Sequence, residues 1–145
     1  MDNLYERVRG LKLPEGKYAV VGGAMQAYGI RDAKDIDILV LPKLFDILEN
    51  SGVWMRCTCE ECKVTGFKIL KEEGIPRGEG VEIICQTYGN SVENIIHNAV
   101  LIDGVLFASL KDMLLWKEAA YANSSRAKDL ADISLLQNYI QRNTG

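Results

Sequence analysis

Two short apolar runs between residues 18 and 41 constrain the fold more than any other feature of this chain. The first run, YAVV at residues 18–21, stops at Gly22-Gly23, which predicts a buried strand that ends in a tight turn. The residues that follow favour a short helix, and the unpaired N–H groups of its first turn are expected beside Gly23. Such a helix start attracts anions, and a phosphate fits there only where the preceding residues lack bulky side chains.

The second run, residues 35–41, alternates acidic and β-branched residues at its start. The two-residue period of a strand sends Asp35 and Asp37 to one face. Like charges so close repel one another, and a hard divalent cation such as Mg²⁺, which prefers carboxylate oxygens, would neutralise them. An acid pair facing a phosphate-sized turn indicates metal-assisted phosphoryl chemistry. The alternative is a glycine turn beside a solvated acidic strand end.

This pattern resembles the DNA polymerase β-like nucleotidyltransferase superfamily. The signature of that family is a Gly-Gly or Gly-Ser turn, about ten residues, and then Asp-x-Asp between hydrophobic residues. Here Gly22-Gly23 is followed, after eleven residues, by Asp35-Ile36-Asp37. The resemblance implies that the glycine turn holds nucleotide phosphates. It also implies that the two acids, with a third carboxylate on a neighbouring strand, bind two Mg²⁺ or Mn²⁺ ions.

The segment between the glycines and the acids also looks like small prokaryotic members of this family. Gly29-Ile30-Arg31 and Lys34 carry that likeness. The resemblance makes Arg31 a candidate nucleotide-binding residue.

The candidate third carboxylate is Glu82, which lies inside the apolar run VEIIC at residues 81–85. A carboxylate on such a strand is costly to desolvate unless it is paired or metal-bound. The resembled family places an acid between hydrophobic residues on the strand after a hairpin, and residues 53–55 and 67–70 are predicted to form that hairpin. The alternative is an edge-strand glutamate that faces water.

Two helices are predicted to close the chain, and each carries a charge on its apolar stripe. Lys117 falls near the middle of the first stripe, and Asp129 falls within the second. The two charges could simply pair in a buried salt bridge. The functional alternative is that Lys117, Arg126-Ala127-Lys128-Asp129 and Asp132 resemble a pattern that closes many small prokaryotic nucleotidyltransferases, including toxin-like members. The lysine of that pattern reaches phosphate, which makes Lys117 and Lys128 candidate nucleotide-binding residues.

Three of the four cysteines are clustered, as Cys57, Cys59 and Cys62. Cys85 lies on a predicted strand that could come close to them. Four thiolates would hold a structural Zn²⁺ ion tetrahedrally, although the spacing is not that of a standard zinc ribbon. A disulfide, in a thermophile, and free thiols are the alternatives.

Composition limits the class of protein. The 145 residues are 48% hydrophobic and 26% charged, which fits one ordinary domain spanning residues 1–145. A net charge of −3 lacks the basic footprint of a general nucleic-acid binder. The first ten residues are too charged for a signal peptide, and no apolar run reaches membrane-spanning length. We therefore expect a cytoplasmic protein with no membrane partner.

The sequence as a whole predicts an α/β (α+β) nucleotidyltransferase fold, with helices packed on a mixed, twisted sheet and two C-terminal helices. The expected activity is metal-dependent transfer of a nucleoside monophosphate from an NTP, such as ATP, to a hydroxyl acceptor. That acceptor could belong to a small molecule, a tRNA or a protein, and a homodimer or a separate partner protein could complete its binding site. Alternatives are a toxin–antitoxin type nucleotidyltransferase acting on tRNA or a partner protein, and a non-catalytic nucleotide-binding module. The presence of all three acids disfavours the last.

Overall fold

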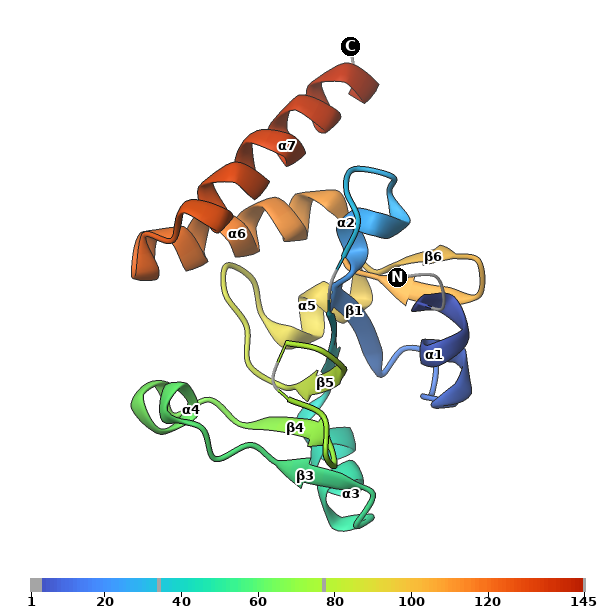
Figure 1. Ribbon diagram of the computed structural model, residues 1–145. Coiled ribbons are helices and arrows are strands. Elements are labelled where there is room, and N and C mark those ends of the chain that lie inside the picture. The colour runs from blue at the N-terminus through green and yellow to red at the C-terminus, as the bar shows by residue number, and fades with distance from the viewer. Residues whose placement is uncertain (1–3, 34, 77, 145) are drawn as a thin grey trace.

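A computed structural model describes residues 4–33, 35–76 and 78–144 of the chain. The sequence also predicts a first helix capped by Asp2, but Asp2 and the family-like Lys34 lie outside the described residues. Within the described part, seven strands form one mixed sheet surrounded by seven helices (Figure 1). The strands are β1 (Tyr18–Gly22), β2 (Ile36–Val40), β3 (Trp54–Arg56), β4 (Ile69–Glu72), β5 (Val81–Ile84), β6 (Val100–Ile102) and β7 (Val105–Phe107). The helices are α1 (Leu4–Gly10), α2 (Ala24–Ala27), α3 (Pro42–Asn50), α4 (Glu60–Thr65), α5 (Val92–His97), α6 (Leu110–Ser124) and α7 (Ala127–Thr144).

The sheet has the strand order β3-β4-β5-β2-β1-β7-β6. Its centre is made of β1, β2 and β5, in which β2 runs antiparallel to β1 and parallel to β5. The α/β expectation of a mixed sheet with two closing helices is therefore confirmed at the level of architecture.

The central strand β2 is covered on both faces. Ile36, Ile38, Leu39 and Val40 are all fully buried, and only Asp37 on this strand is half-buried. A strand at the centre of a sheet flanked by helices needs apolar residues on both faces, which explains the run of branched residues. Asp37, the one polar residue on β2, therefore needs a reason other than packing.

The sequence also predicts helix starts at Pro42, Ser91 and Ser109, and the structure confirms them. A start of the last helix at Ser124 or Ser125 is wrong, because Ser124 ends α6, Ser125 is its C-cap and α7 begins at Ala127. Pro42 is the first residue of α3, where its missing N–H is not needed. Ser91 and Ser109 cap α5 and α6, since their side chains accept hydrogen bonds from the N–H groups of Asn94 and Asp112, each at 3.1 Å.

Two boundaries differ from the prediction. The hairpin of β3 and β4 is confirmed, but β4 begins at Ile69 rather than Phe67, and its connection contains the unpredicted helix α4. The sequence signals for α4 are two acids in its first turn and Gly66 as a left-handed C-cap, and a helix of only six residues is difficult to predict from them. The sequence also predicts Leu130 on the buried stripe of the last helix, but this residue is 47% exposed. The buried face of α7 is formed by Asp129, Asp132, Ile133 and Leu136, and Leu130 lies to one side of it.

The helices divide the molecule into two ends. Figure 1 shows the α6–α7 pair at one end of the sheet and the β3–β4 hairpin, with α3 and α4, at the other. Helix α5 packs on β1 and β2, and α1 packs on β7. Within the described residues, no helix combines the length and the apolar composition needed to cross a membrane.

Candidate functional site: a cleft between acidic strand ends and a cationic helix pair

A cleft of about 440 Å³ opens between the ends of the central strands and the α6–α7 pair. Its walls come from β1, β2 and β5, from the connection around α4, and from the two closing helices. The cleft brings together every residue predicted to bind nucleotide or Mg²⁺, namely Gly22, Gly23, Arg31, Asp35, Asp37, Glu82, Lys117 and Lys128.

Strand register aligns three of these residues across the sheet. Gly22 on β1 lies opposite Asp37 on β2, and Asp37 lies opposite Glu82 on β5. Because neighbours in register point to the same face, the two carboxylates stand side by side on adjacent strands. The register between β1 and β2 shifts between Val20 and Gly22, a bulge of the kind that re-aims a side chain next to a site.

Position 22 must be glycine because any larger residue would clash with the side chain of Asp37. A Cβ atom at Gly22 would lie 2.7 Å from Cγ and 2.8 Å from Cβ of Asp37, closer than carbon atoms can approach. Gly23 is required for a different reason, because its φ of 108° lies in the left-handed region. The helix after it, α2, has only four residues and so too few aligned peptide dipoles to attract an anion strongly. The open space at the glycines, rather than the helix, is the relevant feature.

The three carboxylates have different surroundings. Glu82 is 4% exposed, and its Oε2 accepts a 2.8 Å hydrogen bond from the N–H of Gly78. Asp35 and Asp37 are half-buried. Among the described residues, only the three clustered cysteines have ligand atoms, one from each residue, that all lie within 4.8 Å of one another. The oxygen atoms of these three carboxylates therefore do not all lie within that distance of one another.

The opposite wall of the cleft carries a chain of ion pairs. Lys117 Nζ lies 3.1 Å from Asp132 Oδ2 and 3.7 Å from Asp129 Oδ1. Arg126 donates to Asp129 from Nε at 3.0 Å and from Nη2 at 3.3 Å. The salt-bridge alternative for Lys117 is therefore realised, with Asp132 as the nearer partner. Both aspartates are buried, with 0% and 2% exposure.

Arg31 belongs to the same network. Its Nε and Nη2 donate to the two carboxylate oxygens of Asp132 at 2.8 and 2.9 Å. This two-point pairing fixes the guanidinium plane, so Arg31 shapes the wall of the cleft as well as lining it. Lys128, by contrast, is exposed where it lines the cleft.

The network sets the ionisation of Asp132. Burial alone would raise the pKa of this carboxyl, but the hydrogen bonds from Arg31 and the charge of Lys117 outweigh burial and hold the pKa below its usual range. A lowered folded-state pKa means that the unfolded chain takes up a proton first as the pH falls. The stabilisation by Asp132 is therefore complete above the ordinary aspartate pKa of about 3.9 and is lost as the pH falls through the lower folded-state value.

We accordingly expect the free energy of unfolding of Asp132→Asn to depend less on pH in the acidic range than that of the unchanged protein. The free energy of unfolding of the unchanged protein should drop as the pH is lowered from about 6 to about 3, and the variant should drop less. Urea unfolding at a series of pH values measures both slopes. Arg31→Gln should give an intermediate slope, because Lys117 still faces Asp132. Equal slopes in all three proteins would contradict the assignment.

Sequence reasoning missed an aromatic group in the cleft. The rings of Phe67 and Tyr88 lie 5.6 Å apart, and those of Tyr88 and Trp116 lie 5.8 Å apart at 77°. All three residues line the cleft. They come from three separate segments, so no spacing in the sequence could have linked them.

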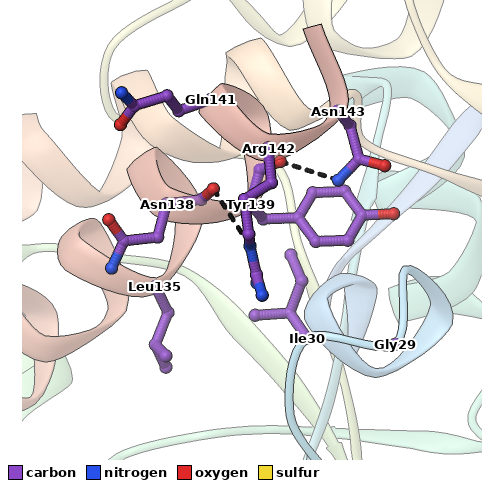
Figure 2. A pocket seen from close by; sticks show the side chains of 8 residues that line it. All are labelled: Gly29, Ile30, Leu135, Asn138, Tyr139, Gln141, Arg142 and Asn143. Atoms are coloured by element: carbon purple, nitrogen blue, oxygen red, sulfur yellow. Dashed lines mark hydrogen bonds between the residues drawn. The ribbon is translucent and has the colours of Figure 1, made fainter. Parts of the chain in front are cut away.

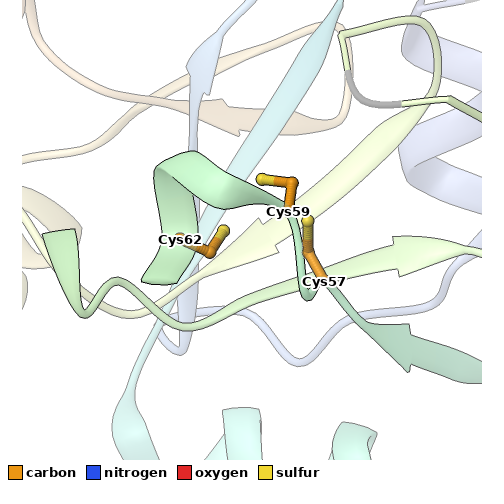
Figure 3. Close-up of side chains that lie close together, drawn as sticks. All are labelled: Cys57, Cys59 and Cys62. Carbon is orange, nitrogen blue, oxygen red and sulfur yellow. The ribbon is translucent and has the colours of Figure 1, made fainter. Parts of the chain in front are cut away.

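The cysteines form a second cluster of potential ligands beside the cleft. Figure 3 shows the sulfur atoms of Cys57, Cys59 and Cys62 turned toward a common space between the end of β3 and α4, and all three lie within 4.8 Å of one another. Burial, followed by hydrogen bonds with Cys59 and Cys57, raises the pKa of Cys62 to about 12. A cluster of this kind could bind a metal ion such as zinc.

The expected fourth ligand, Cys85, does not join the cluster. Ile84 packs against both the small cysteine cluster and the main core, whereas Cys85 packs against the main core alone. Successive residues of an extended chain point to opposite faces, which places Cys85 away from the other sulfur atoms. The prediction of a four-cysteine site that includes Cys85 is therefore wrong. The structure joins none of the four cysteines in a disulfide.

A separate groove of about 600 Å³ lies between Gly29-Ile30 and the C-terminal half of α7. Figure 2 shows the side chain of Arg142 extending from α7 toward Ile30 of that turn. The polar side chains of this groove bond to their own helix, as when Arg142 donates to the carbonyl of Asn138 and Asn143 donates to that of Tyr139. The groove contains no acidic, histidine or cysteine side chain, so we assign the chemistry to the smaller cleft.

A scan against models of known protein families finds no match for this chain, and a search of the curated proteins finds none either. The likeness to nucleotidyltransferases therefore depends on the residues and geometry of the cleft.

Proposed function

We propose that this chain has the nucleotidyltransferase fold and transfers a nucleoside monophosphate from an NTP to a hydroxyl acceptor. The observation that carries the proposal is the register of the central strands, in which Asp37 stands beside Glu82 and opposite a glycine that leaves room for it. Asp35 lines the same cleft.

The distribution of charge in the cleft supports this proposal. Carboxylates line the side formed by the strands, whereas the side formed by the helices carries three cationic residues, Lys117, Arg126 and Lys128, against one lining carboxylate, that of Asp129. A triphosphate with its divalent ion presents negative oxygen atoms and a positive charge at once. A cleft with one acidic side and one basic side is complementary to that pair of charges.

The residues present fit Mg²⁺ or Mn²⁺ by their chemistry, because carboxylate oxygens are the ligands that hard divalent ions prefer. Asp35, Asp37 and Glu82 would hold the ions, which would neutralise charge on the triphosphate.

No residue of the chain needs to act as a nucleophile in the proposed reaction. The acceptor oxygen forms a bond to the α-phosphorus, the bond from that phosphorus to the bridging oxygen breaks, and pyrophosphate leaves. The hydroxyl proton passes to solvent. The role of the cleft is to orient the triphosphate, with space at Gly22 and Gly23 and cations at Lys117 and Lys128.

The aromatic group gives the nucleotide base a place to bind. Tyr88 and Trp116 offer ring faces of the kind on which any base can stack. We propose a cytoplasmic enzyme whose acceptor is a small molecule, a tRNA or a protein, and whose acceptor site is completed by a second copy or by a partner protein. A toxin–antitoxin type enzyme would use the same cleft on a tRNA or on a protein partner.

A non-catalytic nucleotide-binding module is the second candidate. The observation that favours it is that the three carboxylates are not gathered within 4.8 Å of one another. Such a module would bind a nucleotide but would give no transfer of labelled nucleotide to any acceptor, and this separates it from the enzyme.

The test of the proposed function is metal-dependent binding of ATP. We expect calorimetry to detect binding with Mg²⁺ or Mn²⁺ and little binding without a divalent ion. Asp37→Asn removes a charge at nearly constant volume, so the fold should persist while the affinity for ATP with Mg²⁺ falls by more than about tenfold. Glu79→Gln, at an exposed acid outside the cleft, is the matched control. Binding that needs no divalent ion, or that is unchanged in Asp37→Asn, would refute the proposal.

A further inference from the structure

The three-cysteine cluster lies where the end of β3 meets α4. Cys57 follows β3 and extends the pairing with β4, since its N–H donates to the carbonyl of Ile69 at 2.8 Å. Cys59 is the N-cap of α4, and Cys62 lies on its next turn. A single ion held by the three sulfur atoms would therefore join the end of a strand to the helix that follows it.

The spacing of the sulfur atoms suits zinc. A tetrahedral ion with Zn–S bonds of about 2.3 Å places its sulfur ligands roughly 3.8 Å apart. The three Sγ atoms already lie within 4.8 Å of one another, so they need to move together by about 1 Å or less. A disulfide would use only two of the three sulfur atoms, whereas an ion at their common centre uses all of them.

A bound ion would stabilise a part of the molecule that has little apolar packing of its own. The cluster forms its own small core, in which Cys57, Cys62 and Ile69 are the buried members, separate from the main core of the molecule. So little buried apolar surface contributes only weakly to stability. Metal binding would add stability directly, because the ligands are brought together only in the folded chain.

We propose that Cys57, Cys59 and Cys62 bind one Zn²⁺ ion through their thiolates, with an exchangeable ligand such as water in the fourth position. Within the part of the chain that the structure describes, no fourth protein ligand completes the group. The site is distinct from the carboxylate cleft and does not depend on nucleotide chemistry. It would hold the connection from residue 57 to residue 67, part of which, including Glu61 and Phe67, forms a wall of the cleft.

The test is the zinc content of the purified protein and of four serine variants. The unchanged protein and Cys85→Ser should each contain close to one zinc per chain, because Cys85 is not in the cluster. Cys57→Ser, Cys59→Ser and Cys62→Ser should bind zinc more than about a hundredfold more weakly, since loss of a direct ligand should exceed the effect of losing an outer partner. Cys59→Ser is the variant most certain to fold, because serine is a preferred N-cap residue.

Cobalt substitution and hydrogen exchange supply independent readouts. Co²⁺ in the unchanged protein should give sulfur-to-metal charge-transfer absorption and the visible bands of a tetrahedral ion, and both should be absent from Cys59→Ser. Removing zinc with a chelator should speed amide exchange in residues 57–67 and leave β1 and β2 protected. Reduced, folded protein that takes up no zinc, or zinc lost equally from Cys85→Ser, would overturn the proposal. Intact-mass analysis that finds a disulfide within the cluster of zinc-free protein would overturn it in favour of a redox pair.

Discussion

Replacing Asp129 with alanine is expected to lower the free energy of unfolding by about 3 to 5 kcal/mol. The carboxylate of Asp129 is fully buried and faces both Arg126 and Lys117. Without it, the Lys117 side chain, 15% exposed, must share Asp132 with Arg31, so two cations in a poorly solvated place depend on one carboxylate. Chemical denaturation of the purified variant measures the change.

Two further variants control for this effect. Arg126→Gln should cost less than Asp129→Ala, because the Arg126 side chain is 60% exposed and can be hydrated, and the buried Asp129 keeps Lys117 as a partner. The double variant Lys117→Met, Asp129→Leu removes both buried charges together and should be more stable than the sum of the two single changes predicts. Strict additivity, or a loss below 1 kcal/mol in Asp129→Ala, would show that this buried network is energetically unimportant.

The Lys117→Met variant also separates the two roles considered for this lysine. Pairing with Asp129 and Asp132 predicts lower stability. A contact with phosphate in the proposed function predicts weaker ATP binding at temperatures where the variant is still folded. Reduced stability with unchanged nucleotide affinity would limit Lys117 to its structural role.

The second large effect is expected from Gly22→Ala, which should destabilise the fold by about 2 to 3 kcal/mol. The added methyl group would collide with the side chain of Asp37 on the neighbouring buried strand, where neither backbone can move away easily. In the proposed function the same collision would displace a metal ligand, so metal-dependent ATP binding should be lost with it. Thermal unfolding and calorimetry measure the two consequences.

A double-mutant cycle tests whether the collision is the cause. When Asp37 is first changed to glycine, the clashing atoms are gone, and Gly22→Ala should then cost less than about 1 kcal/mol. Gly10→Ala is the matched control, because a Cβ at Gly10 meets nothing within 4 Å and alanine favours the helix there. An equal cost of Gly22→Ala with and without Asp37 would refute the steric explanation.

Local rules determined much of this fold from the sequence alone. The apolar runs at 18–21 and 35–41 contain β1 and β2. The turn between the antiparallel strands β6 and β7 is Asp103-Gly104, a pair typical of hairpins because both residues tolerate positive φ. The caps at Ser91 and Ser109 were equally predictable, because a cap depends only on a side chain and a backbone N–H a few residues away. The alternation in residues 35–38 likewise indicated which carboxylates share a face.

Tertiary structure decided which distant segments meet. The register that sets Asp37 beside Glu82 joins strands more than forty residues apart, and the pairing of Arg31 with Asp132 spans about a hundred. The same is true of the aromatic group, and of Cys85, which packs against the main core and not in the cysteine cluster. The physical reason is that a sequence pattern fixes the direction of a side chain relative to its own element, whereas the neighbour it meets depends on the pairing and register of whole strands.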